Sequence, residues 1–149
     1  MVAKAKAVQF GCGPIGCSVV RYASLRPDVE LVGAVDIDKS LVGRDLGEVA
    51  GIKNKLGVSI SADADAVLSQ ARPDVVFLTT SSSLKVVYPQ VEKCVAAGAN
   101  VISTCEELSY PYRKDPQLSA EIDKIAKANN VTVLATGVNP GFLMDAWPL

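Results

Sequence analysis

Gly11-Cys12-Gly13-Pro14-Ile15-Gly16 is the stretch that decides the fold of this chain. It follows an apolar run, Ala5 to Phe10, and precedes a segment with helical periodicity. G-x-G-x-x-G between a strand and a helix is typical of a dinucleotide-binding βαβ unit, above all when an acidic residue ends the next strand about 20 residues later. Asp36 occupies that position. The sequence therefore predicts a nucleotide fold with a phosphate site at this turn.

The residues of the turn suit a diphosphate for separate physical reasons. Gly11 permits the tight bend, Gly13 lets a pyrophosphate approach the backbone, and Gly16 allows close packing of helix on strand. Pro14 is harmless at a helix start, where an N–H would have no partner. Unpaired N–H groups and the positive helix end attract phosphate, so we include Ile15 and its neighbours in the turn among the cofactor-binding residues. The alternative is a tight strand-to-helix turn without a ligand.

Length and composition describe one domain with a substantial core. The chain has 149 residues, of which 49% are hydrophobic and 21% charged, and its net charge is −1. This balance indicates neither disorder nor a nucleic-acid partner. The first residues lead directly into a strand, and no apolar run approaches membrane-spanning length, so we expect a cytoplasmic protein without a signal peptide and without a membrane partner.

The cysteine and histidine counts restrict the chemistry. The four cysteines have no C-x-x-C spacing, which indicates reduced thiols instead of a disulfide framework or zinc site. The chain has no histidine. This excludes Ser-His and Cys-His nucleophile pairs and argues against a transition-metal site, so no metal is expected.

Strand-like and helix-like segments alternate along the whole chain. The strands are rich in Val and Ile instead of alternating with polar residues, which is typical of a parallel sheet covered on both faces. We predict a doubly wound α/β fold of the Rossmann type, with six strands in the order 3-2-1-4-5-6. The first expected strand ends with residues 8–10, and the other five strands are expected at 30–36, 58–60, 74–79, 100–104 and 131–135. We expect helices at 15–25, 64–70, 84–97 and 116–129, and an irregular segment at 37–57.

Ligands of such a sheet bind beyond the carboxyl ends of its strands. Asp36, at the second strand end, can accept hydrogen bonds from the adenosine ribose diol, which favours NAD and repels a 2′-phosphate. Lys39 and Arg44 follow closely and could offset that repulsion, so NADP stays open. The alternative for these two basic residues is ordinary solvated surface.

Small polar residues follow three later strands. Thr80, Ser81 and Ser82 leave room for the nicotinamide ribose and can hydrogen-bond its oxygens, although Ser82 or Ser83 can instead cap the helix that starts at Leu84. Thr104 ends the fifth strand. At the end of the sixth, Asn139 can bind the carboxamide or a substrate atom, or belong to a rigid turn.

Two adjacent carboxylates, Glu106 and Glu107, follow the fifth strand. A carboxylate near a nicotinamide can serve as general base, and because neighbours at a strand end point to opposite sides, one of the pair should face the cleft. The alternative is a solvated loop. Cys105 has no histidine to activate it and is expected to be a packing residue.

With these motifs assembled, the chain resembles the N-terminal half of the 2,4-diaminopentanoate dehydrogenase and native amine dehydrogenase family, distant relatives of dihydrodipicolinate reductase. The resemblance covers essentially the whole chain. The segments that carry it are 11–16, 33–38, 43–47, 101–111 and 136–145.

The resemblance implies an NAD(P)-dependent oxidoreductase that deaminates an amine oxidatively, or aminates a ketone reductively with ammonia. It implies that one glutamate of the pair is the acid/base group; we favour Glu107 and keep Glu106. It also implies a second, substrate-binding domain. We therefore expect a dinucleotide-binding domain over 1–141, the start of a linking helix over 142–149, and little or no turnover by this part alone. Exposed Phe142, Leu143, Met144 and Trp147 are candidates for a homodimer contact.

Two other functions remain open. One is a dihydrodipicolinate reductase-like enzyme that reduces a cyclic imine. The other is a non-catalytic nucleotide-binding module of the same fold, which would not need the glutamate pair. A methyltransferase fits the six parallel strands less well.

Overall fold

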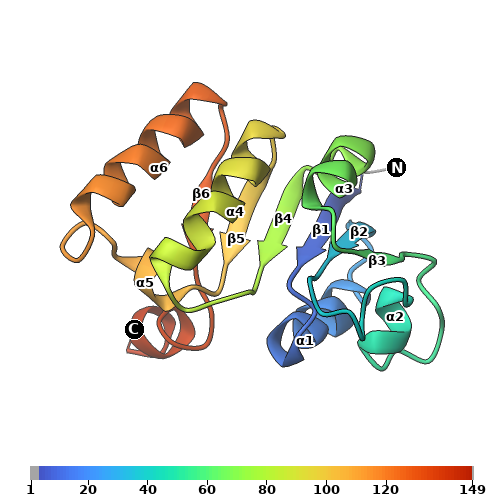
Figure 1. The fold of residues 1–149 in the computed structure, drawn as a ribbon. Coiled ribbons are helices and arrows are strands. Elements are labelled where there is room, and N and C mark those ends of the chain that lie inside the picture. Colours follow the sequence, from blue (N-terminus) through green and yellow to red (C-terminus); the bar gives the residue numbers. More distant parts are fainter. Residues whose placement is uncertain (1–3, 149) are drawn as a thin grey trace.

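The computed structural model describes residues 4–148 and contains a six-stranded parallel sheet (Figure 1). The strand order is β3-β2-β1-β4-β5-β6, which confirms the predicted doubly wound fold. All strand pairs are parallel, so their carboxyl ends lie along one edge of the sheet. The strands are β1 (Ala5–Phe10), β2 (Val29–Val35), β3 (Ile60–Ser61), β4 (Val75–Leu78), β5 (Asn100–Ser103) and β6 (Val133–Ala135).

The helices connect successive strands and lie on both sides of the sheet. In Figure 1, α3, α4 and α6 lie in front of the strands, and α5 lies near their carboxyl ends. Helix α1 packs on β1 and β2 and contacts α2. The helices are α1 (Pro14–Ala23), α2 (Leu46–Val49), α3 (Ala64–Ala71), α4 (Leu84–Ala96), α5 (Glu106–Ser109) and α6 (Pro116–Ala128), followed by a π-helical turn, η1 (Phe142–Ala146).

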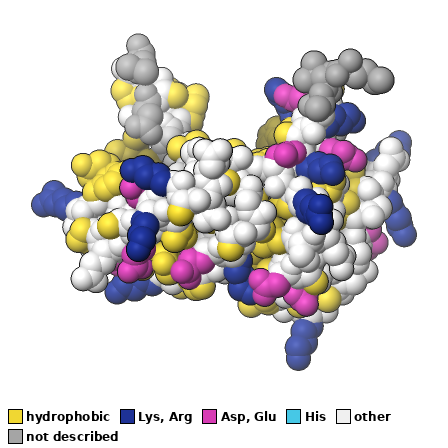
Figure 2. Space-filling view, turned by 90° about the horizontal axis from the view of Figure 1, so that it is seen from above, with side chains coloured by type: hydrophobic (Ala, Val, Ile, Leu, Met, Phe, Trp, Pro, Cys, Tyr) yellow, Lys and Arg dark blue, Asp and Glu magenta, His cyan; other side chains and the backbone are white. Residues whose placement is uncertain are grey.

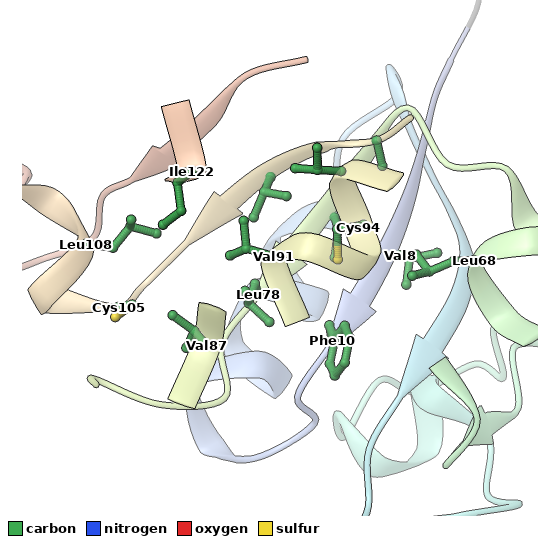
Figure 3. Close-up of a cluster of buried hydrophobic side chains, with 14 of the residues drawn as sticks. Val8, Phe10, Leu68, Leu78, Val87, Val91, Cys94, Cys105, Leu108 and Ile122 are labelled. Carbon is green, nitrogen blue, oxygen red and sulfur yellow. The ribbon is translucent and has the colours of Figure 1, made fainter. Parts of the chain in front are cut away.

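The core consists of two clusters, one on each face of the sheet. The larger cluster joins strand residues such as Val8 and Phe10 to Val87 and Val91 of α4 and to Ile122 of α6 (Figure 3). The smaller cluster packs α1 and α2 against the other face. Each fully buried Val or Leu contributes about 1.5–3 kcal/mol relative to an exposed one. These two layers hold the strands, and therefore the loops at their carboxyl ends, in fixed register.

Coverage of the second face is incomplete, which differs from the expectation of a sheet buried on both sides. Strand β5 alternates between exposed and buried residues, and Ile102 is 36% exposed. Leu134 of β6 is 51% exposed. The reason is that α1 and α2 pack over the β1–β3 half, so within residues 4–148 this face of β5 and β6 has no full cover.

Several local elements differ from the sequence expectations. The short third strand is Ile60–Ser61 instead of 58–60, and residues 37–57 contain the short helix α2. Asp45 caps α2 by accepting hydrogen bonds from the N–H groups of Gly47 and Glu48. The glutamate pair lies in a helical turn, α5, instead of an extended strand end.

The surface mixes charges of both signs. Figure 2 shows Lys and Arg side chains interspersed with Asp and Glu on the face seen there. Across residues 4–148, no helix has the length and apolar character needed to cross a membrane. The same residues contain no group of three or more His, Cys, Asp or Glu arranged to hold a metal ion.

Candidate functional site

In the glycine turn between β1 and α1, two of the three glycines have no room for a side chain. Gly11 has φ +96, and a Cβ there would lie 2.9 Å from Cγ2 of Thr80. A Cβ on Gly16 would lie 1.9 Å from the carbonyl oxygen of Gly11. Gly13 differs, because a Cβ there would meet no atom within 4 Å. Side chains at Gly11 and Gly16 would therefore strain the turn, whereas Gly13 borders open space.

Two polar side chains fasten the turn to the sheet. The Nε2 group of Gln9 donates to the Gly11 carbonyl and to Oγ1 of Thr79, both at 2.8 Å. The Thr79 hydroxyl in turn donates to the Gly11 carbonyl at 2.9 Å. Gln9 is fully buried, and its Oε1 has no partner in the described chain. We did not predict this role for Gln9; the available signal was a polar residue within the apolar run of the first strand.

The start of α1 offers backbone donors to a ligand. Pro14 occupies the first turn, as predicted. The N–H groups of Ile15 and Gly16 have no acceptor among the described residues, as expected for the first turn of a helix. Together with the open space at Gly13, these donors have the arrangement with which helix N-termini bind anions in other proteins.

Asp36 lies beside the same turn, at the carboxyl end of β2. Its Oδ2 accepts a hydrogen bond from the Cys12 N–H at 2.6 Å, and its Oδ1 accepts one from the Asp38 N–H at 2.8 Å. The carboxylate is therefore oriented, while each oxygen keeps further acceptor capacity. Burial, followed by the Asp36 charge, raises the pKa of the Cys12 thiol to about 12, so this cysteine stays protonated and unreactive.

The two basic residues considered near Asp36 are exposed. The guanidinium of Arg44 pairs with Glu48 at 2.7 Å, one helical turn further on. Lys39 is exposed, and its ammonium group has no ion pair within 4–148. In the structure Arg44 therefore contacts Glu48 at the surface, and Lys39 is exposed to solvent.

A cavity of about 520 Å³ adjoins the carboxyl ends of β1 and β2. Ile37 and Ala62 line one side, and Pro89 and Gln90 of α4 line another. The Thr80 hydroxyl donates to Oε1 of Gln90 at 2.5 Å. This bond directs the amide NH₂ of Gln90 away from Thr80. Thr80 was predicted from the sequence, but Ile37, Ala62, Pro89 and Gln90 were not, because a contact between a strand end and a mid-helix position leaves no local pattern.

A larger groove of about 1160 Å³ extends from α1 across the exposed sheet face. Its α1 side is mainly apolar, with Ile15, Val19 and Tyr22, whereas the loops after β4, β5 and β6 contribute mostly small and polar side chains. Those predicted from the sequence are Ile15, Thr80, Ser81, Ser82, Thr104, Glu106 and Asn139.

The two glutamates of α5 have different surroundings. Glu106 is exposed in the large groove, and its carboxylate has no hydrogen bond or ion pair with residues 4–148. Glu107 accepts a hydrogen bond from the Leu84 N–H at 2.8 Å and forms an ion pair with Lys114. The bond from Lys114, followed by that from Leu84, lowers the pKa of Glu107. The residue that faces the groove is therefore Glu106 and not the favoured Glu107.

The start of α4 explains where Glu107 is used. Ser83 occupies the N-cap position, but its side chain makes no capping hydrogen bond. The Glu107 carboxylate supplies the acceptor instead. Ser83 thus takes the N-cap position that the alternative expected, but its hydroxyl does not cap the helix. Cys105 is buried as expected, and burial raises the pKa of its thiol.

The comparisons with known proteins agree with this geometry. A family model described as "Dihydrodipicolinate reductase, N-terminus" matches residues 6–106, from the first strand to Glu106. The chain belongs to the dihydrodipicolinate reductase N-terminal domain family. Membership accounts for the order of the strands and for the position of the glycine turn.

The relatives of this chain carry two kinds of name, amine or diaminopentanoate dehydrogenase and 4-hydroxy-tetrahydrodipicolinate reductase. The 2,4-diaminopentanoate dehydrogenase of Acetoanaerobium sticklandii is 33% identical over 95% of this chain and 40% of its own length. An amine dehydrogenase of Streptomyces virginiae is 29% identical with the same coverage. The solved amine dehydrogenase of Mycobacterium smegmatis superposes with a TM-score of 0.90 and 34% identity, over 97% of this chain and 42% of that one. The chain thus spans about 40% of the length of these relatives.

Proposed function

We propose that this chain is the dinucleotide-binding part of an NAD(P)-dependent amine dehydrogenase, in which Glu106 is the acid/base group. The observation that carries the proposal is the position of Glu106. Its unpaired carboxylate lies in the groove that also contains Ile15, at the start of α1, and Thr80, beside the glycine turn. A nicotinamide and a proton acceptor can therefore share one space.

The described residues fit a dinucleotide along its length. The amides of Ile15 and Gly16 would bind the pyrophosphate in the space in front of Gly13. Asp36 would accept hydrogen bonds from the adenosine ribose, and the smaller cavity beside Ile37 would hold the adenine.

The nicotinamide end would occupy the larger groove. Ser81, Ser82 and Thr104 supply hydroxyls for the ribose, and Asn139 supplies an amide for the carboxamide. NAD is favoured over NADP, because the oriented carboxylate of Asp36 would repel a 2′-phosphate. The exposed Lys39 is the basic side chain available to offset that repulsion.

Glu106 suits the proton chemistry of amine oxidation. An alkylammonium must lose a proton before its α-hydride can leave, and the Glu106 carboxylate would accept that proton. Its negative charge would also stabilise the iminium formed as the carbon–nitrogen double bond develops. Bound NAD(P)⁺ supplies the hydride acceptor. Water then releases ammonia and a ketone from the iminium, and the reverse sequence is reductive amination.

A substrate domain belongs to the same proposal. The relatives extend beyond the 40% that matches, and the groove is open over β5 and β6. We assign residues 1–141 to the nucleotide domain and 142–149 to the start of the link. Closure of a second domain would exclude water from the groove, so this part alone should turn over slowly or not at all. Homodimerisation through Phe142 and Trp147, both exposed, is part of the same proposal.

A chimera tests the role of Glu106. Residues 1–149 would replace the equivalent portion of the Mycobacterium smegmatis amine dehydrogenase, and amine-dependent reduction of NAD⁺ would be followed at 340 nm. Glu106→Gln should lower the rate by about 10²–10⁴-fold while leaving NADH binding intact. Glu30→Gln, at an exposed site on β2, is the matched control. An active Glu106→Gln chimera would contradict the assignment.

The family model favours a second candidate, reduction of a cyclic imine. Glu106 would then donate a proton to the imine nitrogen instead of accepting one from an ammonium. Assays with a cyclic imine and with a ketone plus ammonia, each with NADH and NADPH, distinguish the two reactions.

A further inference from the structure

Helix α5 has only four residues, Glu106–Ser109, and a helix of this length is not stable by itself. Its orientation must therefore come from contacts with other segments. This matters for Glu106, whose carboxylate has no partner within residues 4–148 to hold it in the groove. The direction of that side chain depends on how its neighbours are held.

The backbone before and within α5 is held by the loop that follows β4. The Cys105 thiol and the Glu107 N–H both donate to the carbonyl of Ser82, at 3.1 and 3.3 Å. Leu108 is buried in the larger core cluster. These contacts fix the residues on either side of Glu106 and leave Glu106 itself on the opposite, solvent-facing side.

The side chain of Glu107 adds a second attachment, to two different elements. One carboxylate oxygen accepts the Leu84 N–H at the start of α4, and the other pairs with Lys114, which precedes α6. Glu107 is 30% exposed and Lys114 is 70% exposed. Such an exposed ion pair stabilises the fold only slightly. It ties α5 to the segment before α6, while the bond from the Leu84 N–H ties α5 to the start of α4.

The low pKa of Glu107 agrees with this division of labour. Its carboxylate stays ionised and committed to donors, whereas Glu106 has none. Two neighbouring carboxylates in different environments commonly take different roles in one site.

We propose that Glu107 and Lys114 are positioning residues: their ion pair, together with the bond from Glu107 to α4, holds α5 so that Glu106 points into the groove. The inference rests on the proposed function, because Glu106 is its acid/base group. It predicts that breaking the pair disturbs Glu106 without disturbing nucleotide binding at the glycine turn.

The test uses the full chain with ¹³C-carboxyl-labelled glutamate, observed by NMR while NAD⁺ is added. Glu106→Gln assigns the Glu106 signal, which should shift when the nicotinamide enters the groove. In Lys114→Met and in Glu107→Gln that shift should fall by about half or more, while the NAD⁺ dissociation constant stays within about twofold. Lys114→Arg should restore the shift. Lys127→Met, which breaks the exposed pair with Asp123, should leave it unchanged.

The outcomes distinguish a failure of the positioning role from a failure of the proposed function. A wild-type Glu106 shift in both Lys114→Met and Glu107→Gln would overturn the positioning role and leave the proposed function standing. A loss of NAD⁺ affinity of about tenfold in Lys114→Met would also overturn it, because the pair would then serve the nucleotide. Absence of NAD⁺ binding, or of any Glu106 response in the wild type, would reject the proposed function, and the positioning role with it. Because Lys114 is exposed, its variants carry the test even if Glu107→Gln fails to fold.

Discussion

The glycine turn at 11–16 and the acidic turn at 105–108 occupy equivalent places, since each follows a parallel strand and begins a helix at the same edge of the sheet. They are built in different ways. The glycine turn depends on missing side chains, because a Cβ on Gly11 or Gly16 would collide with backbone or side-chain atoms. The acidic turn depends on side chains that are present, above all the carboxylate of Glu107. The first can be recognised from adjacent residues of the sequence, whereas the second depends on residues that only the fold brings together.

The largest effect is expected where the glycine turn has no tolerance. In Gly16→Ala the new Cβ would lie 1.9 Å from the Gly11 carbonyl oxygen, so α1 must move away from β1. Overpacking of this kind typically costs about 1–3 kcal/mol, which exceeds the roughly 1 kcal/mol that alanine gains over glycine in a helix. Urea unfolding should show the lower stability, and NADH fluorescence should show the loss of binding. An unchanged unfolding midpoint would mean that the turn is looser than described.

Gly13→Val separates ligand binding from folding in the same turn. No atom lies within 4 Å of a Cβ at this position, so the variant should fold and lose about 1 kcal/mol or less, mainly from the poor N-cap residue. The side chain would fill the pyrophosphate space. Wild-type affinity for NADH is expected on the order of micromolar, and binding by the variant should be undetectable. Normal binding by Gly13→Val would show that the phosphates lie elsewhere.

Asp36 is the side-chain contribution to the glycine-turn site, and its removal should have an intermediate effect. Asp36→Ala removes an acceptor for the ribose and the bond to the Cys12 N–H. Hydrogen bonds to charged groups are worth about 1.5–3 kcal/mol, so NADH affinity should fall by about tenfold or more. NADPH affinity should fall less, because a repulsive charge also disappears. Competition titrations of both coenzymes measure the difference; equal losses would separate Asp36 from NAD preference.

The two turns also differ in how well the sequence predicted them. The strand order and the roles of Gly11 and Gly16 in the turn depend on short-range patterns, and the structure confirms them. The choice between Glu106 and Glu107 depended on their contacts with Leu84 and Lys114. Leu84 lies 23 residues before Glu107, and Lys114 lies 7 residues after it, so neither contact follows from the strand end itself. The prediction that one glutamate faces the cleft assumed an extended strand end. A helical turn produces the separation instead.

Contacts across the strand ends were the least predictable part of the site. Gln9 looked like an interruption of an apolar strand, yet its amide holds the glycine turn. The cavity beside Ile37 joins a strand end to the middle of α4. No residue pattern along the chain reports such a juxtaposition, because strand order decides which loops meet.

The smallest effect on stability is expected at Asp45. Its side chain holds the irregular segment between β2 and β3, as the side chain of Glu107 holds α5. The Asp45 carboxylate accepts from the N–H groups of Gly47, Glu48, Leu56 and Gly57, at 2.8–3.2 Å. Burial raises the pKa of Asp45, but these four donors outweigh it and lower the pKa below its usual value.

Because the folded-state pKa is lowered, the stabilisation from ionised Asp45 is complete above the unfolded pKa and is lost as the pH falls through the folded value. Asp45→Asn should therefore be less stable than the wild type by about 1 kcal/mol at pH 7, since an amide cannot accept all four bonds. The gap should narrow as the pH is lowered through the acidic range, because the wild-type carboxyl is then protonated as well. Urea unfolding midpoints at pH 7 and at pH 3 provide the comparison, and the shared response of Glu107 cancels between the two proteins. A gap that does not change with pH would mean that Asp45 acts through its shape and not through its charge.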